Sequence, residues 1–138
     1  MVVDIIFSFS ENAKIGEKAP EFTTQLVNGE NYSLSNSRGN YVLLYFWGSW
    51  CGPCITVSDY LDVLQEQYIN DLYILSLSEE TPETVKKFLN RRPTRFATAI
   101  DYDGETFKKY GVKDLPFAVL LDADANIVWQ GNPANKIS

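Results

Sequence analysis

The chain has 138 residues, of which 45% are hydrophobic and 22% are charged, and its net charge is −6 at pH 7. These values are typical of one soluble domain with its own hydrophobic core. Nucleic-acid-binding domains usually carry a basic surface, so we expect no nucleic-acid partner. The chain has no histidine and only two cysteines. A Ser-His-Asp triad, a Cys-His dyad and a four-ligand Cys/His zinc site within one chain are therefore excluded.

The first residues are apolar but are interrupted by Asp4, and no basic residue precedes them. A signal peptide has a basic start, an uninterrupted apolar stretch and a small-residue cleavage site, so this segment does not resemble one. We expect residues 1–14 to form an extension or an extra strand, or to be the remnant of a leader. The globular domain is expected to span residues 15–138.

The next elements in chain order are a hairpin and a buried strand. Two short runs, Glu21–Leu26 and Glu30–Leu34, flank Asn28-Gly29, a dipeptide that favours hairpin turns because both residues tolerate positive φ. The run Tyr41–Trp47 is continuously apolar and rich in aromatic and branched residues. This pattern predicts a strand that is buried on both faces, as in a parallel sheet.

Helices and strands then alternate along the chain. Apolar residues recur at helical spacing after the cysteines, and Thr81-Pro82-Glu83 has the composition of a helix start. A short helix is predicted at Glu105–Tyr110, and strands are predicted at Leu72–Leu77, Phe96–Ile100, Phe117–Leu121 and Ile127–Gln130. Alternation of this kind predicts parallel crossovers and an α/β fold with a central mixed sheet.

Both cysteines lie in the stretch WGSWCGPC, where Cys51 directly follows the predicted buried strand. Cys51 is therefore expected at the N-terminus of the next helix, where free N–H groups and the helix dipole stabilise a thiolate and lower the thiol pKa. Cys54 lies one helical turn later and is expected to be the more buried, resolving thiol. Gly52 separates Cys51 from Pro53, and a proline is well tolerated in the first turn of a helix.

A thiolate at Cys51 can attack a disulfide, and Cys54 can then resolve the mixed disulfide. Three other interpretations remain open from the residues alone. They are a structural disulfide, which stabilises little because its loop is so short, an inert reduced pair, and a zinc site completed by a second chain. We favour the redox interpretation.

The motif resembles the active site of thioredoxin-fold proteins, and Leu115-Pro116 before an apolar run resembles their cis-proline loop. Two further segments resemble the TlpA-like, AhpC/TSA-related thiol–disulfide oxidoreductases. They are Ile15–Phe22, which has the pattern G-x-x-A-P-x-F, and the stretch RGNYVLLYFWGSWC that ends at Cys51. The resemblance extends from about Ile15 to Gly131. It implies a thioredoxin fold with an N-terminal β-hairpin extension.

The resemblance also implies roles for residues outside the cysteine pair. Pro116 would form a cis peptide bond facing the cysteines, and Leu115 would pair its backbone with an extended substrate. Trp50 and Trp47 would form an apolar surface for substrate beside the disulfide.

Two positions depart from the family pattern. Many thioredoxins have a buried aspartate where this chain has Tyr45, and many cytochrome-maturation members have a glutamate where it has Val57. Either carboxylate would help to move the proton of the resolving thiol. Glu79 or Glu80 could substitute for the missing carboxylate through a water molecule, but we favour the interpretation that both are solvated loop acids.

The motif and the resemblance together imply a bacterial thiol–disulfide oxidoreductase that contributes to cell redox homeostasis through a redox-active CxxC disulfide and needs no other cofactor. By resemblance, we expect a periplasmic or otherwise extracytoplasmic monomer that reduces protein disulfides and receives electrons from an upstream thiol reductant, such as a membrane-bound one. The alternatives are a peroxiredoxin-like peroxidase, or a binding module of the same fold with idle thiols.

Overall fold

The computed structural model describes residues 15–137, so the predicted extension over residues 1–14 lies outside the described part of the chain. Within residues 15–137, seven strands form one sheet in the order β2-β1-β5-β4-β3-β6-β7. The strands are β1 (Thr23–Leu26), β2 (Asn31–Ser33), β3 (Tyr41–Phe46), β4 (Leu72–Ser78), β5 (Ala97–Ile100), β6 (Phe117–Leu121) and β7 (Ile127–Gly131). The helices are α2 (Gly52–Gln67), α3 (Pro82–Arg91), α4 (Glu105–Lys109) and α5 (Ala134–Ile137), with 3-10 turns η1 (Leu34–Ser37) and η2 (Tyr102–Gly104).

The sheet is mixed, as the alternation of patterns predicts. Strands β3, β4 and β5 are parallel and are connected through α2 and α3. Strand β6 pairs antiparallel with β3, and β7 pairs antiparallel with β6 at the edge of the sheet. The N-terminal hairpin of β1 and β2 joins the other side of the sheet, where β1 pairs antiparallel with β5.

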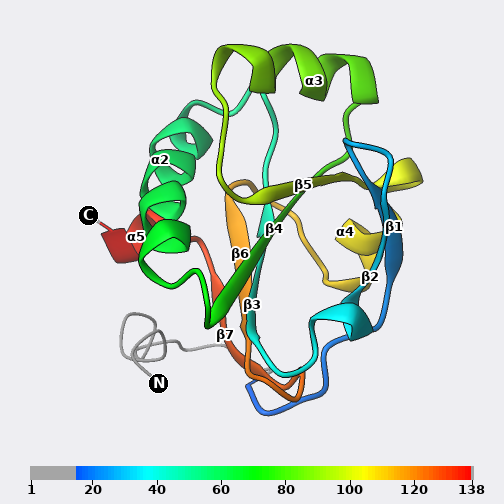
Figure 1. Ribbon diagram of the computed structural model, residues 1–138, viewed down its shortest axis with the longest axis vertical. Helices are drawn as coiled ribbons and strands as arrows, with labels where there is room; N and C mark the ends of the chain where they lie inside the picture. Colours follow the sequence, from blue (N-terminus) through cyan, green and yellow to red (C-terminus); the bar gives the residue numbers. More distant parts are fainter. Residues whose placement is uncertain (1–14, 138) are drawn as a thin grey trace.

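Strand β3 is buried on both faces because helices and loops cover both sides of the sheet. Figure 1 shows α2 and α5 on one side of the central strands, and α4 with the hairpin on the other. Leu43 and Tyr45 belong to the core beneath α2 and α3, whereas Leu44 and Phe46 belong to the core beneath α4 and the hairpin. The apolar run in the sequence reflects this alternation between two cores.

Local signals place most element boundaries. The Thr81 hydroxyl accepts a 3.2 Å hydrogen bond from the N–H of Thr84, which caps α3 as the sequence predicts. The second hairpin strand ends earlier than predicted, because Leu34 begins η1. There the Asn36 side chain accepts a 2.9 Å hydrogen bond from the N–H of Ser33, which favours a turn over an extended strand.

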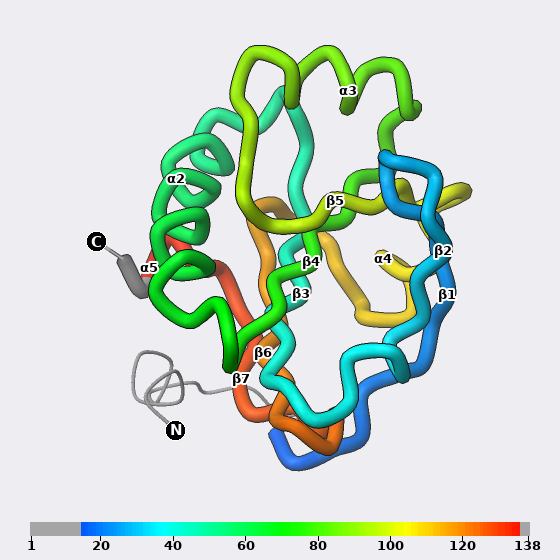
Figure 2. The backbone as a smooth tube through the Cα atoms, in the orientation of Figure 1, coloured from blue at the N-terminus to red at the C-terminus, as the bar shows by residue number. Residues whose placement is uncertain are grey.

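The strand pairing brings three chain segments to one edge of the sheet. Phe46 pairs in parallel with Leu77, so the chain leaves β3 and β4 at the same edge, as can be followed in Figure 2. Phe46 also pairs with Phe117 in antiparallel β6, so the residues just before β6 lie at this edge as well. The cysteine motif, the end of β4 and Leu115-Pro116 therefore converge.

Candidate active site

The two cysteines form a disulfide across the first turn of α2, with their Cα atoms 5.3 Å apart. Cys51 is the N-cap residue of α2, and its Sγ accepts a 3.2 Å hydrogen bond from the N–H of Cys54. Pro53 lies in the first turn, where the missing N–H removes no helical hydrogen bond. The sulfur of Cys51 thus occupies the position at which a helix N-terminus stabilises an anion.

Both cysteines of the disulfide are buried, but the residues beside them in the motif are exposed to solvent. Cys51 is 3% exposed and Cys54 is 1% exposed, whereas Gly52 and Pro53 are exposed. Trp50, immediately before Cys51, is 73% exposed and is the most exposed of the large hydrophobic side chains in residues 15–135. An indole ring in this position offers apolar surface directly beside the disulfide.

Trp47 has a different environment from Trp50. Its side chain is only 4% exposed, and its ring lies 5.2 Å from the ring of Phe88 on α3. Its indole Nε1 is buried without a hydrogen-bond partner among the described residues. The predicted contact between Trp47 and substrate is therefore wrong for this structure, because the core covers the indole.

The Leu115–Pro116 peptide bond is cis. Pro116 is buried, and Leu115 is half-buried and packs against both hydrophobic cores. This segment enters β6 at the sheet edge where the cysteine motif lies.

Tyr45 links strand β3 to the start of α2. Its hydroxyl donates a 2.8 Å hydrogen bond to the carbonyl oxygen of Cys54 and lies 3.1 Å from the Ser58 hydroxyl. Burial raises the pKa of Tyr45 well above its usual range, so the phenol stays protonated and serves as a donor. Val57 is fully buried in the core under α2. Neither position therefore supplies a carboxylate to the resolving cysteine.

The two acids after β4 have different surroundings. Glu80 is half-buried, and its carboxylate accepts hydrogen bonds from the N–H of Ser49 at 2.8 Å and from the Ser49 hydroxyl at 2.5 Å. Glu79 is exposed, and its carboxylate lies against Gly104 at the start of α4. Reasoning from sequence did not identify Ser49, because nothing in the pattern pairs it with an acid 31 residues later.

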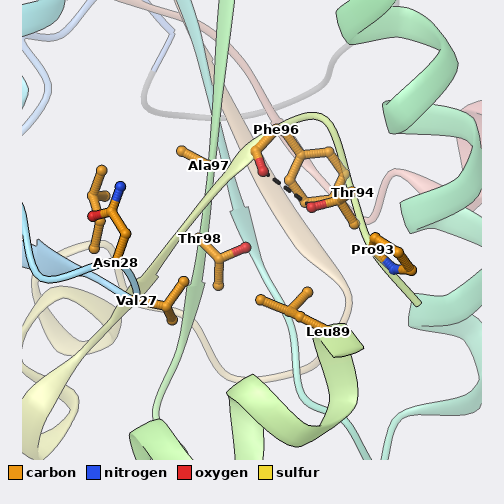
Figure 3. Close-up of a pocket in the computed structure, with 9 residues that line it drawn as sticks. Val27, Asn28, Leu89, Pro93, Thr94, Phe96, Ala97 and Thr98 are labelled. Atoms are coloured by element: carbon orange, nitrogen blue, oxygen red, sulfur yellow. Dashed lines mark hydrogen bonds between the residues drawn. The ribbon is translucent and has the colours of Figure 1, made fainter. Parts of the chain in front are cut away.

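No other feature of the described residues competes with this site for redox chemistry. Among residues 15–137, no cluster of three or more potential metal ligands is found, and no helix is long and apolar enough to cross a membrane. A pocket of about 250 Å³ lies between the β1–β2 turn and the segment leading into β5 (Figure 3). Val27, Leu89 and Thr98 are among the residues that line it, but neither cysteine does.

Comparisons with known proteins identify the family. The AhpC/TSA family model matches residues 15–130. A curated relative, the thiol-disulfide oxidoreductase ResA of Bacillus cereus (strain ATCC 10987 / NRS 248), is 36% identical over 126 residues, which cover 90% of this chain and 73% of the relative.

Solved structures give the same result. A Chlorobium tepidum protein described as a thiol:disulfide interchange protein of the DsbE type superposes with a TM-score of 0.84 at 31% identity, covering 91% of this chain and 92% of that chain. A thiol-disulfide oxidoreductase from Bacteroides fragilis superposes with a TM-score of 0.77 at 27% identity, covering 86% and 93%. The chain therefore belongs to the AhpC/TSA family and is a TlpA-like thiol–disulfide oxidoreductase with a thioredoxin fold.

Proposed function

We propose that this protein reduces disulfides in other proteins, with Cys51 as the nucleophile and Cys54 as the resolving thiol. The observation that carries the assignment is the position of the Cys51 sulfur, which accepts the Cys54 N–H at the N-terminus of α2. The same surroundings would stabilise a thiolate once the disulfide is reduced. Cys54 lies within the helix and is the less exposed of the two.

The reaction proceeds in two exchange steps that conserve sulfur bonds. The Cys51 thiolate attacks a substrate disulfide, a Cys51–substrate bond forms, and the first substrate sulfur leaves as a thiolate that takes up a proton. The Cys54 thiolate then attacks the Cys51 sulfur, the Cys51–Cys54 disulfide forms, and the second substrate thiolate leaves. Two electrons pass to the substrate, so an upstream dithiol must reduce the protein again. The cysteine pair carries both electrons without a further cofactor.

Substrate is expected to bind around the exposed Trp50. The Leu115–Pro116 segment ends at the same sheet edge, and in our proposal the backbone of Leu115 pairs with an extended substrate chain. We further propose, with support from the resemblance to TlpA-like proteins, that the protein acts outside the bacterial cytoplasm and receives electrons from a membrane-bound thiol reductant, and we expect it to act as a monomer. Cell fractionation and size-exclusion chromatography of the full chain test these two expectations.

The reduction potential tests the direction of electron flow. The protein is equilibrated with thiol–disulfide buffers, and tryptophan fluorescence reports the fraction reduced. A potential at or below about −250 mV supports a reductase, since thioredoxin lies at about −270 mV. A value above about −180 mV indicates disulfide formation or shuffling and overturns the proposed direction.

Cysteine variants test the two roles. Cys54→Ser is expected to accumulate a mixed disulfide with a disulfide-containing protein substrate such as insulin. Cys51→Ser is expected to accumulate none. The reverse pattern contradicts the assignment. Consumption of hydrogen peroxide by the wild-type protein, without reduction of insulin, would instead indicate a peroxiredoxin-like peroxidase, and failure in both assays would indicate a binding module.

A further inference from the structure

The residues just before Cys51 form a tight turn. The N–H of Cys51 donates a 3.1 Å hydrogen bond to the carbonyl oxygen of Gly48, so Ser49 and Trp50 occupy the two central positions. The Trp50 indole folds back over Gly48, where a Cβ atom would lie only 2.6 Å from the indole Nε1. The turn thus determines where the exposed indole lies and where Cys51 enters α2.

Glu80, two residues after the end of β4, contacts this turn. Its Oε1 accepts from the N–H of Ser49 at 2.8 Å, and its Oε2 accepts from the Ser49 hydroxyl at 2.5 Å. The Ser78 hydroxyl donates to Glu80 Oε1 at 2.9 Å and accepts from the N–H of Glu80 at 3.1 Å. Both carboxylate oxygens of Glu80 therefore accept hydrogen bonds, and its backbone N–H is also bonded.

The Glu80 side chain contacts Ser49 at two points, the peptide N–H and the hydroxyl. Ser49 uses both its backbone donor and its hydroxyl, so the carboxylate restrains the orientation of the peptide as well as its position. Within the described structure, Glu79 has no comparable bond to the motif and lies instead against Gly104.

We propose that Glu80 is a positioning residue for the thiol chemistry, and that its two-point contact with Ser49 keeps the Gly48–Cys51 turn in the form that places Cys51 at the helix N-terminus. The role rests on the proposed assignment of Cys51 as the nucleophile. It differs from acceptance of a proton through water, because it depends on the reach and hydrogen bonding of the side chain and not on its charge.

Two substitutions separate reach from charge. Glu80→Gln keeps the length of the side chain, an acceptor for the Ser49 N–H and a donor for its hydroxyl, but removes the charge. Glu80→Asp keeps the charge but shortens the side chain by one methylene, so it cannot make both contacts without moving the turn. Glu79→Gln and Glu79→Asp are the matched controls on the adjacent acid.

The readout is the rate at which iodoacetamide alkylates Cys51 in the reduced protein between about pH 6 and pH 10, with the modified cysteine identified by peptide mass spectrometry. We expect Glu80→Asp to slow alkylation near neutral pH about five- to tenfold, and to shift the pH profile upward, as the thiolate loses its helix N-terminal partners. Glu80→Gln and both Glu79 variants are expected within about twofold of wild type, the scatter of neutral surface changes.

Ser49→Ala provides a second line of evidence if a Glu80 variant does not fold. It removes only the hydroxyl contact, and it is expected to slow alkylation about threefold. Wild-type alkylation rates in both Glu80→Asp and Ser49→Ala overturn the proposal. A pH profile in which Glu80→Gln departs from wild type and Glu80→Asp does not overturns it as well.

The alkylation assay also separates this proposal from the proposed function, because alkylation does not require a protein substrate. Failure to reduce insulin counts against the proposed function alone. Alkylation of Cys54 in place of Cys51 counts against the assignment of the nucleophile.

Discussion

The hydroxyl group of Tyr45 donates a 2.8 Å hydrogen bond to the carbonyl oxygen of Cys54, and so ties the central strand β3 to the first turn of α2. This tyrosine stands where many thioredoxins have a buried aspartate. A phenol whose pKa is raised by burial remains a donor at neutral pH. The position therefore stabilises the backbone around the resolving cysteine instead of accepting its proton.

Tyr45→Phe is expected to lower the free energy of unfolding by about 1–2 kcal/mol, since it removes a buried hydrogen bond with little change in volume. Urea unfolding of the oxidised protein measures the effect. Tyr102→Phe is the matched control, because Tyr102 is 54% exposed, and it should change stability by less than about 0.5 kcal/mol. Equal stability of the two variants would show that the Tyr45 hydroxyl contributes nothing.

Trp50→Ala is expected to lower kcat/KM for insulin about tenfold, through a higher KM, because the exposed indole supplies apolar contact area to a protein substrate. Reduction of a small synthetic disulfide should change by less than about twofold, since such a substrate buries little of the indole. The thermal midpoint should stay near that of wild type, as the side chain is 73% exposed.

The control for Trp50 is Ile69→Ala. Ile69 is 72% exposed, but it follows the far end of α2, a 16-residue helix that is about 24 Å long. Its loss should leave insulin reduction unchanged. A similar fall in both variants would mean that Trp50 has no particular role in binding substrate.

Gln65 is buried, and its amide side chain bridges two backbone groups of β4. It donates to the carbonyl oxygen of Leu72 at 2.7 Å and accepts from the N–H of Ile74 at 2.9 Å. Strand β5 pairs with β4 only from Leu75 onward. The Gln65 side chain therefore provides hydrogen-bond partners for backbone groups of β4 that precede this pairing.

Gln65→Leu is expected to reduce the free energy of unfolding by about 2–4 kcal/mol, because two buried backbone groups lose their partner. Chemical denaturation measures the loss. Gln67→Leu at the exposed end of the same helix is the control. A Gln65→Leu protein as stable as that control would contradict the bridging role.

Alkaline pH should destabilise the fold through Tyr32. Burial raises the pKa of Tyr32 to about 12 from its ordinary value of 10.0, and its hydroxyl shares a 2.7 Å hydrogen bond with Ser37. Below the ordinary value, folded and unfolded chains both keep the proton, and the contribution to stability is complete. Between pH 10 and about 12, the unfolded chain releases the proton first, so unfolding becomes more favourable as pH rises.

The slope is about 1.4 kcal/mol per pH unit for one tyrosine. Denaturant unfolding of the oxidised wild type and of Tyr32→Phe, compared across this range, isolates the contribution, because other titrating groups are common to both proteins. The variant should lose stability less steeply. Parallel curves would show that Tyr32 ionises equally easily in the folded and unfolded states.

Elements that depend on local patterns are predicted well from the sequence. The continuous apolar run at β3, the helical spacing in α2 and the Thr81 cap of α3 each depend on residues within a few positions of one another. The short helix α5 has only four residues, too few to show a helical period, and it was not predicted.

The sequence by itself determined where the reactive groups lie along the chain, because two cysteines three residues apart directly after a buried strand predict a cysteine pair at a helix N-terminus. Only the tertiary structure decided the surroundings of that pair. Trp47 and Trp50 belong to one motif, yet the first is covered by Phe88 of α3 and the second faces solvent. Glu80 reaches Ser49 because β3 and β4 are parallel neighbours that end at the same edge. Such contacts join residues that are distant along the chain, and no local pattern encodes them, because they depend on how strands and helices pack.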